Sequence, residues 1–242
     1  MEVGSVEDAT VSHRRADGEV EEERPWGTVG VSELSQAAPW RTFRWYRGQR
    51  HYSGTYWSAT VGDHVMYESR LELARLLFAD FDPLVRHVAA QPFLVKALVQ
   101  GKIRKHIPDY LLMTREGPLI VDVKPKRRLE KPEVAFTFAW TRQVVQDRGW
   151  RYEVWSEPAP APLENVRFLA GYRRDWLFPG ELLDAVEAAV VDGMTLGEAA
   201  DRVAGFAPEL ARAGVFHLLW AGRMMTDLQR PLSASHVLRR AA

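Results

Sequence analysis

The feature that most constrains this chain is a predicted β-hairpin near its centre. Apolar residues dominate 107–113 and 119–123, and the turn residues Glu116-Gly117-Pro118 separate the two runs. If Glu116 and Gly117 form a two-residue loop, Asp109 lies opposite Lys124 across the two strands. The sequence therefore predicts an antiparallel hairpin with charged residues at its open end.

Three charged side chains share one face of that hairpin. Side chains alternate along a strand, so Asp109, Asp122 and Lys124 point to the same side of the sheet. Neighbours on one face lie about 5–8 Å apart, and two carboxylates this close repel each other unless a cation lies between them. Oxygen ligands favour Mg²⁺ or Mn²⁺, and a lysine can stabilise developing negative charge. The alternative is an ordinary hairpin with a cross-strand Asp–Lys pair.

The distribution of charge favours a polyanionic partner. The formal net charge of the 242 residues is zero, so the overall charge does not favour any particular kind of partner. Residues 96–131, however, contain ten Lys or Arg and four Asp or Glu. This basic stretch surrounds the acidic pair, which alone would repel DNA. Lys126, Arg127 and Arg128 follow the hairpin directly, and we expect them to contact phosphate; the alternative is a solvated surface.

Several classes of protein are disfavoured by composition. The chain has no cysteine, which excludes disulfides and thiolate zinc sites. No apolar run approaches the ~20 residues that a membrane helix needs, and the N-terminus has no hydrophobic signal-peptide core. We therefore expect a cytoplasmic protein without membrane contact. The histidines show no metal-binding spacing, and His106, beside the hairpin, is interpreted as structural.

The N-terminal part shows two kinds of composition. Residues 1–38 lack sustained periodicity and include the acidic run 18–23, so they are predicted to form a disordered acidic tail. Residues 39–58 are dense in aromatic and basic side chains, which can stack on bases and contact phosphates. Packing of these rings on the core is the alternative, and it is the one that we favour.

A helix is predicted before the hairpin, over residues 64–79, with Asp63 as its N-cap. Glu68 and Glu72 lie on the same side of it, one turn apart. Glu72 borders the apolar face, so it is the better candidate to reach a metal site on the sheet. The alternative is a solvated pair between Glu72 and Arg75.

The remaining pattern predicts an α/β domain. Strands are expected at 93–99 and 151–155, and a helix at 133–147, which begins at Pro132-Glu133 and ends before Gly149. The order of helices and strands predicts a mixed sheet with helices on its faces.

The C-terminal part, residues 179–242, changes to helical character. One helical run opens at Pro179 and ends near Val191, a second starts at a capping-box match at Thr195, and a third spans 207–221. The tail 226–240 is short enough to be a β-wing. These features predict a small winged-helix-like domain. The segment has six arginines against eight acidic residues, which disfavours a DNA reader. The apolar residues predict a protein-docking surface instead: Phe216, Leu218, Leu219 and Trp220.

Four motifs in this order resemble the TnsA family, the endonuclease subunits of heteromeric transposases, within the PD-(D/E)xK nuclease superfamily. They are Tyr67-Glu68-Ser69-Arg70-Leu71-Glu72-Leu73, Gln91-Pro92-Phe93, Pro108-Asp109-Tyr110 and Val121-Asp122-Val123-Lys124-Pro125. The resemblance covers about residues 40–230. It implies a restriction-endonuclease-like core at 39–172 and a winged-helix-like domain at 179–242.

The resemblance also implies roles for individual residues. Asp109, Asp122 and Glu72 would bind Mg²⁺ or Mn²⁺, and Lys124 would be the catalytic lysine. Glu68 is a possible substitute for Glu72. Gln91 would support the site, either by hydrogen bonds to the metal-site helix or by contact with substrate.

The function implied by the resemblance is a Mg²⁺-dependent DNA endonuclease that cleaves the 5′ ends of a transposon. A transposase of the RNase H-like type would cleave the 3′ ends, and a regulatory AAA+ ATPase would control both. One alternative is another nuclease of the superfamily, acting in restriction or repair. Another is a catalytically silent DNA-binding assembly module, which a metal-dependent nicking assay would distinguish.

Overall fold

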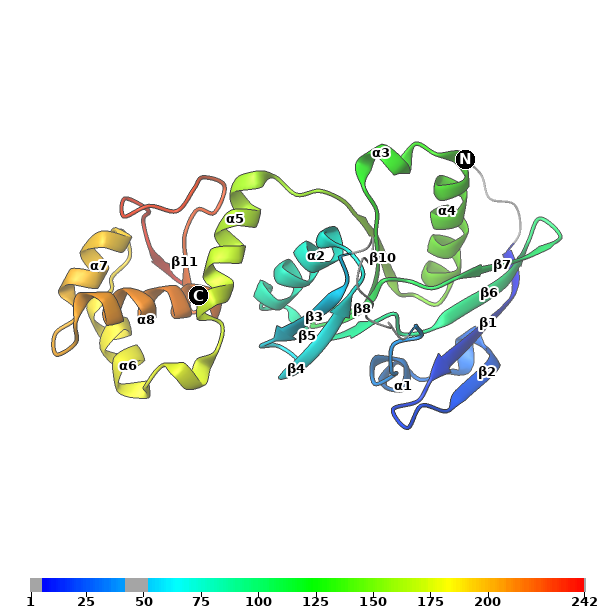
Figure 1. Ribbon diagram of the computed structural model, residues 1–242, viewed down its shortest axis with the longest axis horizontal. Helices are drawn as coiled ribbons and strands as arrows, with labels where there is room; N and C mark the ends of the chain where they lie inside the picture. Colours follow the sequence, from blue (N-terminus) through cyan, green and yellow to red (C-terminus); the bar gives the residue numbers. More distant parts are fainter. Residues whose placement is uncertain (1–5, 42–51, 242) are drawn as a thin grey trace. The chain divides into compact units, whose positions relative to one another are not determined.

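The computed structural model describes residues 6–41 and 52–241, and the chain divides into two compact units (Figure 1). The first unit comprises the residues up to Ala79 together with Leu84–Glu157, and the second comprises Asp80–Pro83 together with Pro158–Ala242. In the described residues, no helix has both the length and the apolar character needed to cross a membrane.

The boundary between the units corrects the expected domain limits of 39–172 and 179–242. The second unit already starts after Glu157, because α5 (Pro160–Leu169) and η2 (Ala170–Tyr172) belong to it. The proline-rich stretch that suggested a stiff connector begins this helix instead. A proline in the first helical turn needs no N–H donor there, and its fixed φ suits the helix.

Two four-stranded sheets form the frame of the first unit. One has the order β2-β1-β6-β7 and is antiparallel throughout. The other has the order β10-β9-β8-β5 and is mixed, because only β10 and β9 are parallel. The strands are β1 (Val6–Arg14), β2 (Val20–Pro25), β5 (Val85–Ala90), β6 (Leu94–Val99), β7 (Lys102–His106), β8 (Tyr110–Thr114), β9 (Gly117–Val123) and β10 (Arg151–Trp155). The expected strands and mixed sheet are present, but β6 lies in the antiparallel sheet.

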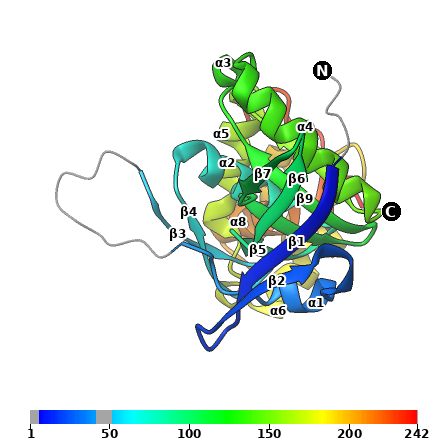
Figure 2. The same ribbon diagram turned by 90° about the vertical axis from the view of Figure 1, so that its right-hand side faces the viewer.

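Two helices cover opposite faces of the mixed sheet (Figures 1 and 2). From α2 (Arg70–Phe81), Arg75 pairs with Glu153 at 2.8 Å. From α4 (Pro132–Asp147), the Arg142 guanidinium lies 5.0 Å from the ring centroid of Tyr152. Because neighbouring residues of a strand point to opposite faces, α2 and α4 lie on different sides of β10. The expected helix at 133–147 is confirmed, and it is preceded by the short helix α3 (Lys126–Leu129).

The predicted helix at 64–79 is confirmed only in part, because α2 begins later, at Arg70. Residues 63–67 form β4 (Asp63–Tyr67), which pairs with β3 (Gly54–Ser58) in a separate two-stranded sheet. The Ser69 hydroxyl accepts a hydrogen bond from the Glu72 N–H at 3.1 Å, so Ser69 rather than Asp63 caps the helix. Glu68 therefore lies before the first turn of α2.

Residues 6–38 are not a disordered tail, which corrects the prediction for 1–38. β1 lies in the interior of the antiparallel sheet, paired with β2 and β6. The short helices η1 (Trp26–Thr28) and α1 (Val31–Ser35) follow, and their side chains Trp26 and Leu34 are buried in the core. The acidic run of β2 stays compatible with the fold because its side chains meet cations, as Glu23 does with Lys96.

Half of the aromatic and basic segment at 39–58 lies outside the described residues, which lack 42–51. Tyr56 is buried, whereas Tyr52, whose ring lies 6.4 Å from the ring of Tyr67, is 56% exposed. Tyr56 therefore agrees with the packing interpretation, and the exposed ring of Tyr52 does not.

The second unit is built around one central helix. The three expected helices are confirmed as α6 (Gly180–Ala189), α7 (Leu196–Arg202) and α8 (Pro208–Trp220), and the capping box of Thr195 with Glu198 is present. The 3-10 turn η3 (Asp175–Leu177) precedes them, and β11 (Met224–Met225) pairs with β12 (Arg239–Arg240). A winged-helix architecture for this unit stays a prediction.

The proposed docking surface on the last helix is wrong. Four of its apolar side chains are buried within the second unit: Phe216, Leu218, Leu219 and Trp220. The helix α8 packs on α5, α6 and α7, so its sequence is apolar on nearly every side. The excess of apolar residues reflects a central position in the core and not an exposed face.

Substitution of Trp26 tests whether the N-terminal residues belong to the cooperative core of the first unit. Its side chain is 5% exposed, its ring lies 5.1 Å from Phe93, and its Nε1 donates to the Val144 carbonyl at 3.0 Å. We expect Trp26→Ala to lower the free energy of unfolding by about 3–5 kcal/mol, as large core truncations do, measured by urea denaturation. Val20→Ala, at an exposed position of β2, should cost less than about 1 kcal/mol. Equal small losses would place Trp26 outside the cooperative core.

Candidate active site

The hairpin forms with a different loop from the one expected. β8 pairs with β9 so that Thr114 faces Gly117, which makes Arg115-Glu116 the two-residue loop. Gly117 follows the turn at φ +99, a conformation that suits glycine. The register differs by two residues from the prediction, and an even shift keeps each side chain on its face. Extending the register one position past Tyr110 and Val121 places Asp109 opposite Asp122, not Lys124.

Asp122 accepts a hydrogen bond from the buried Tyr152 and contacts the partly buried His106. The His106 Nε2 lies 2.8 Å and 2.9 Å from the two carboxylate oxygens, and the Tyr152 hydroxyl donates to Oδ2. Asp122 pairs with Val154 in the parallel register of β9 and β10, so Tyr152, two residues earlier, lies on the same face. Burial, and next the Asp122 charge, raise the pKa of the Tyr152 hydroxyl, so it remains a donor. Asp122 is therefore fixed in position.

Asp109 lies close to the negative charges of other carboxylates. One carboxylate oxygen, Oδ2, accepts from the Val123 N–H at 2.6 Å. Burial raises the pKa of the Asp109 carboxyl well above its usual value, and the charges of Asp122 and Glu72 raise it further. The Val123 N–H and the Lys124 ammonium act in the opposite direction. A cation at this place would remove the electrostatic part of that penalty.

Glu72 has a capping role at the start of α2. Its carboxylate accepts from the Glu68 N–H at 2.7 Å and from the Ser69 hydroxyl at 2.8 Å. Burial raises the pKa of Glu72 above its usual value. In the part of the chain described, Glu72, Asp109 and Asp122 do not bring three ligand atoms within 4.8 Å of one another. Glu72 would have to leave its capping contacts to join a shared metal.

Gln91 connects the segment that bears Glu68 to the segment that bears Asp109. Its side-chain Nε2 donates to Glu68 Oε1 at 2.6 Å, and its backbone N–H donates to the Asp109 carbonyl at 2.8 Å. Its Oε1 accepts from the Arg41 N–H at 3.2 Å. The residue is buried and adopts φ +46, an uncommon conformation for a non-glycine residue. Of the two predicted roles for Gln91, these contacts favour support of the site.

Lys124 lies at the end of β9 and lines the same cavity as the carboxylates. Its N–H donates to the Trp155 carbonyl at 2.9 Å, which fixes the backbone, and its ammonium lies 5.9 Å from the ring centroid of Phe138. Its charge lowers the pKa values of Asp109 and Glu72, although burial outweighs it. The lysine is therefore close enough to act electrostatically on the acidic groups.

The cavity has a volume of about 380 Å³, and its donors suit a hard divalent cation. Four carboxylates line it, from Glu68, Glu72, Asp109 and Asp122, opposed by the cations Arg41, Lys105 and Lys124. A carboxylate has about four acceptor positions, so His106 and Tyr152 do not exhaust those of Asp122. The side chains of Asp109 and Asp122 thus fit Mg²⁺ or Mn²⁺.

The predicted DNA-binding residues follow the site directly. Lys126, Arg127 and Arg128 form α3 and are exposed. The Lys126 N–H donates to the Glu157 carboxylate at 2.9 Å, which lowers the pKa of Glu157 and holds the start of the helix. The three cations are thus presented to solvent near Lys124, in a position available to a polyanion.

The first unit is an α/β fold of the nuclease-like kind, with paired carboxylates at the end of a central hairpin. Residues 82–157 match the family model described as TnsA-like endonuclease N terminal. The match supports a TnsA-like nuclease, as the motifs indicate, and that family implies nuclease activity. The match contains Gln91, Asp109, Asp122 and Lys124 but begins after Glu72. A search of curated proteins found no match.

Sequence reasoning missed two members of the site, His106 and Tyr152. His106 was interpreted as structural because a single histidine carries little information by itself. Tyr152 lies on the fourth predicted strand, and only a parallel register with β9 would have placed it beside Asp122. Both contacts depend on tertiary structure, so no spacing in the sequence predicts them.

Asp109→Asn tests the crowding of negative charge. A raised pKa in the folded state means that ionised Asp109 destabilises the fold, so this cost appears as the pH rises above the ordinary value of about 3.9. Without divalent cations, the variant should melt at a higher temperature than the wild type at pH 7. The difference should shrink as the pH falls towards about 4.

The control is Asp63→Asn, since the Asp63 side chain is 81% exposed and lies on β4. It should leave the melting temperature unchanged across the same pH range. Mg²⁺ should stabilise the wild type more than Asp109→Asn. A melting temperature for Asp109→Asn equal to or below that of the wild type at pH 7 would contradict the electrostatic account.

Proposed function

We propose that this protein is a metal-dependent DNA endonuclease that cleaves the 5′ ends of a transposon together with a partner transposase. The observation that carries the proposal is the juxtaposition of Asp109 and Asp122 in a cavity that Lys124 also lines. The family match to residues 82–157 supports the nuclease class and its link to transposition.

In this proposal, Asp109 and Asp122 hold the metal ion, and Glu72 is an outer ligand, with Glu68 as its possible substitute. When bound, Mg²⁺ or Mn²⁺ would supply a more acidic water and neutralise phosphate charge. Lys124 orients the attacking water or stabilises the charge that develops on the phosphate. His106 and Tyr152 keep Asp122 in position by hydrogen bonds. Gln91 keeps Glu68 beside the cavity.

The partners follow from the same proposal. Duplex DNA would lie along the exposed cations of α3, and an RNase H-like transposase would cleave the other strand. The regulatory AAA+ ATPase is proposed to bind the second unit, which we regard as a winged-helix-like assembly module. Six arginines against eight acidic residues in 179–242 support a protein partner over DNA for this unit.

The catalytic assignment is tested by cleavage of supercoiled plasmid with Mg²⁺, with and without the partner transposase. Asp109→Ala and Asp122→Ala should abolish cleavage. Lys124→Ala should lower the rate on the order of 10²–10³-fold, the usual effect of losing one electrostatic stabiliser, yet keep Mg²⁺ binding in calorimetry because the ammonium is no ligand.

The controls are Asp63→Ala and Arg202→Ala, at exposed positions, which should cleave like the wild type. Full activity of either aspartate variant would remove that residue from the site. Loss of Mg²⁺ binding in Lys124→Ala would contradict the role of the lysine. A wild type that binds DNA but never cleaves it would support the silent assembly module.

The DNA-binding assignment is tested by the salt dependence of affinity. Replacing Lys126, Arg127 and Arg128 with alanine should weaken binding to any duplex. Each lost phosphate contact should lower the log–log salt slope by about 0.9. A matched triple variant of exposed arginines in the second unit, at Arg202, Arg212 and Arg239, should keep the slope. Equal slopes for both triple variants would show that α3 does not contact DNA.

A further inference from the structure

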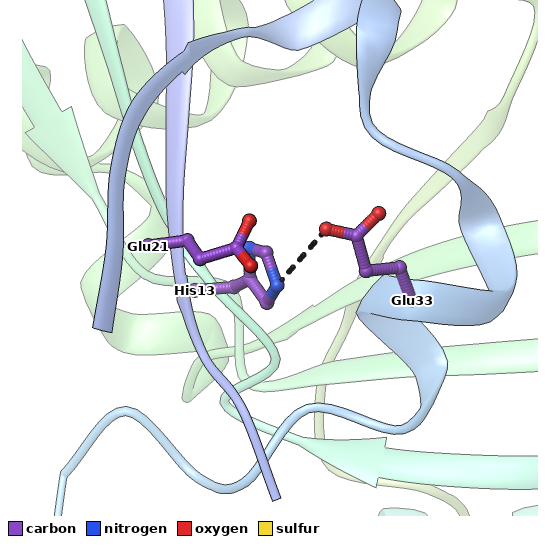
Figure 3. Close-up of side chains that lie close together, drawn as sticks. All are labelled: His13, Glu21 and Glu33. Carbon is purple, nitrogen blue, oxygen red and sulfur yellow. Dashed lines mark ion pairs between the residues drawn. The ribbon is translucent and has the colours of Figure 1, made fainter. Parts of the chain in front are cut away.

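A second group of ligand-type side chains lies away from the nuclease site, where β1, β2 and α1 meet (Figure 3). His13 comes from β1, Glu21 from β2 and Glu33 from α1. One ligand atom from each lies within 4.8 Å of the others, which is the closeness required by a shared metal ion. Figure 3 shows the Glu21 carboxylate beside the imidazole ring and the Glu33 carboxylate facing it.

His13 is the unusual member of this group. It is 1% exposed, and neither ring nitrogen has a hydrogen-bond partner among the described residues. Its Nε2 lies 3.2 Å from a Glu33 oxygen, but without hydrogen-bond geometry. A buried polar group without a hydrogen bond is costly and rare. The buried imidazole therefore lies beside two carboxylates without a hydrogen bond to either of them.

A β-bulge in the β1–β2 hairpin accompanies the pairing of Glu21 with His13. Between Val11 and His13 the register of β1 with β2 shifts, and the Ser12 hydroxyl accepts from the Glu23 N–H at 3.0 Å. Glu23 adopts φ +53 at the bulge. An extra residue in one strand re-aims the side chains around it. Arg24, three residues after Glu21, pairs with both Glu21 and Glu33.

Arg24 already supplies a cation to the two carboxylates. Its Nη1 donates to Glu21 Oε2 at 2.9 Å and to Glu33 Oε1 at 2.6 Å, and the Arg15 Nη1 lies 3.9 Å from Glu21. The Arg24 side chain is 39% exposed, so it can move into solvent without crossing the core. Its contacts leave the His13 ring without a partner. A metal ion would satisfy the imidazole and both carboxylates at once.

We propose that His13, Glu21 and Glu33 form a binding site for a divalent transition metal ion such as Zn²⁺, with Arg24 as the competing internal cation. One imidazole nitrogen and two carboxylates are a donor set that suits Zn²⁺. The nuclease site offers oxygen donors, which suit Mg²⁺. The ion would join α1 to the β1–β2 hairpin, so its role is structural and independent of cleavage.

The test is calorimetric titration of the full chain with ZnCl₂. Asp109→Asn is present in every protein to weaken binding at the nuclease site. Glu33→Gln should weaken zinc binding at least about tenfold, and zinc should no longer raise its melting temperature. The matched control is Glu22→Gln, an exposed residue of the same strand as Glu21, which should bind zinc unchanged.

Arg24→Gln separates a metal site from an ordinary ion-pair cluster. If the guanidinium competes with the metal, its removal should tighten zinc binding by about fivefold. If the cluster exists only to bind Arg24, the variant should lose stability and gain no zinc affinity. The proposal is overturned if Glu33→Gln and Glu22→Gln bind zinc alike, or if Arg24→Gln does not bind it more tightly.

Discussion

The first unit holds two mutually repelling carboxylates opposite each other at the open end of a hairpin. Asp109 and Asp122 occupy the position where β8 and β9 separate, in surroundings dry enough to raise the pKa of Asp109 well above its usual value. Such an arrangement costs stability unless a cation neutralises it. The surrounding fold is arranged to keep the two groups together despite that cost.

Residues from both sheets hold Asp109 and Asp122 in position. His106 ends a strand of the antiparallel sheet, whereas Asp122 and Tyr152 belong to the mixed sheet, so the contact of His106 with Asp122 links the two. Gln91 lies between β5 and β6, where the chain passes from one sheet to the other, and its N–H binds the Asp109 carbonyl. The same junction therefore positions both aspartates, through the buried Gln91 and the partly buried His106.

The sequence predicted those parts of the fold that depend on local pattern. The hairpin, the helix at 133–147 and the shared face of Asp109 and Asp122 follow from alternation and turn residues, and an even shift of register left the face unchanged. The prediction of a disordered tail was wrong for residues 6–38 because β1 pairs with β6, which is distant in the sequence. Trp220 and its neighbours were misjudged because apolarity alone does not distinguish an exposed face from a central core helix. Glu72 lines the cavity, its role as a metal ligand stays a prediction, and its capping contacts depend on where α2 begins.

The central claim is that Asp109 and Asp122 together hold a divalent cation. Anomalous diffraction from crystals grown with Mn²⁺ tests it most directly, because the signal locates the ion without regard to activity. The account predicts an anomalous peak between the two carboxylates that is absent from Asp109→Asn crystals. It would be contradicted if saturating Mn²⁺ gave no peak there, with Asp109 still bound by the Val123 N–H and Asp122 by His106 and Tyr152 alone.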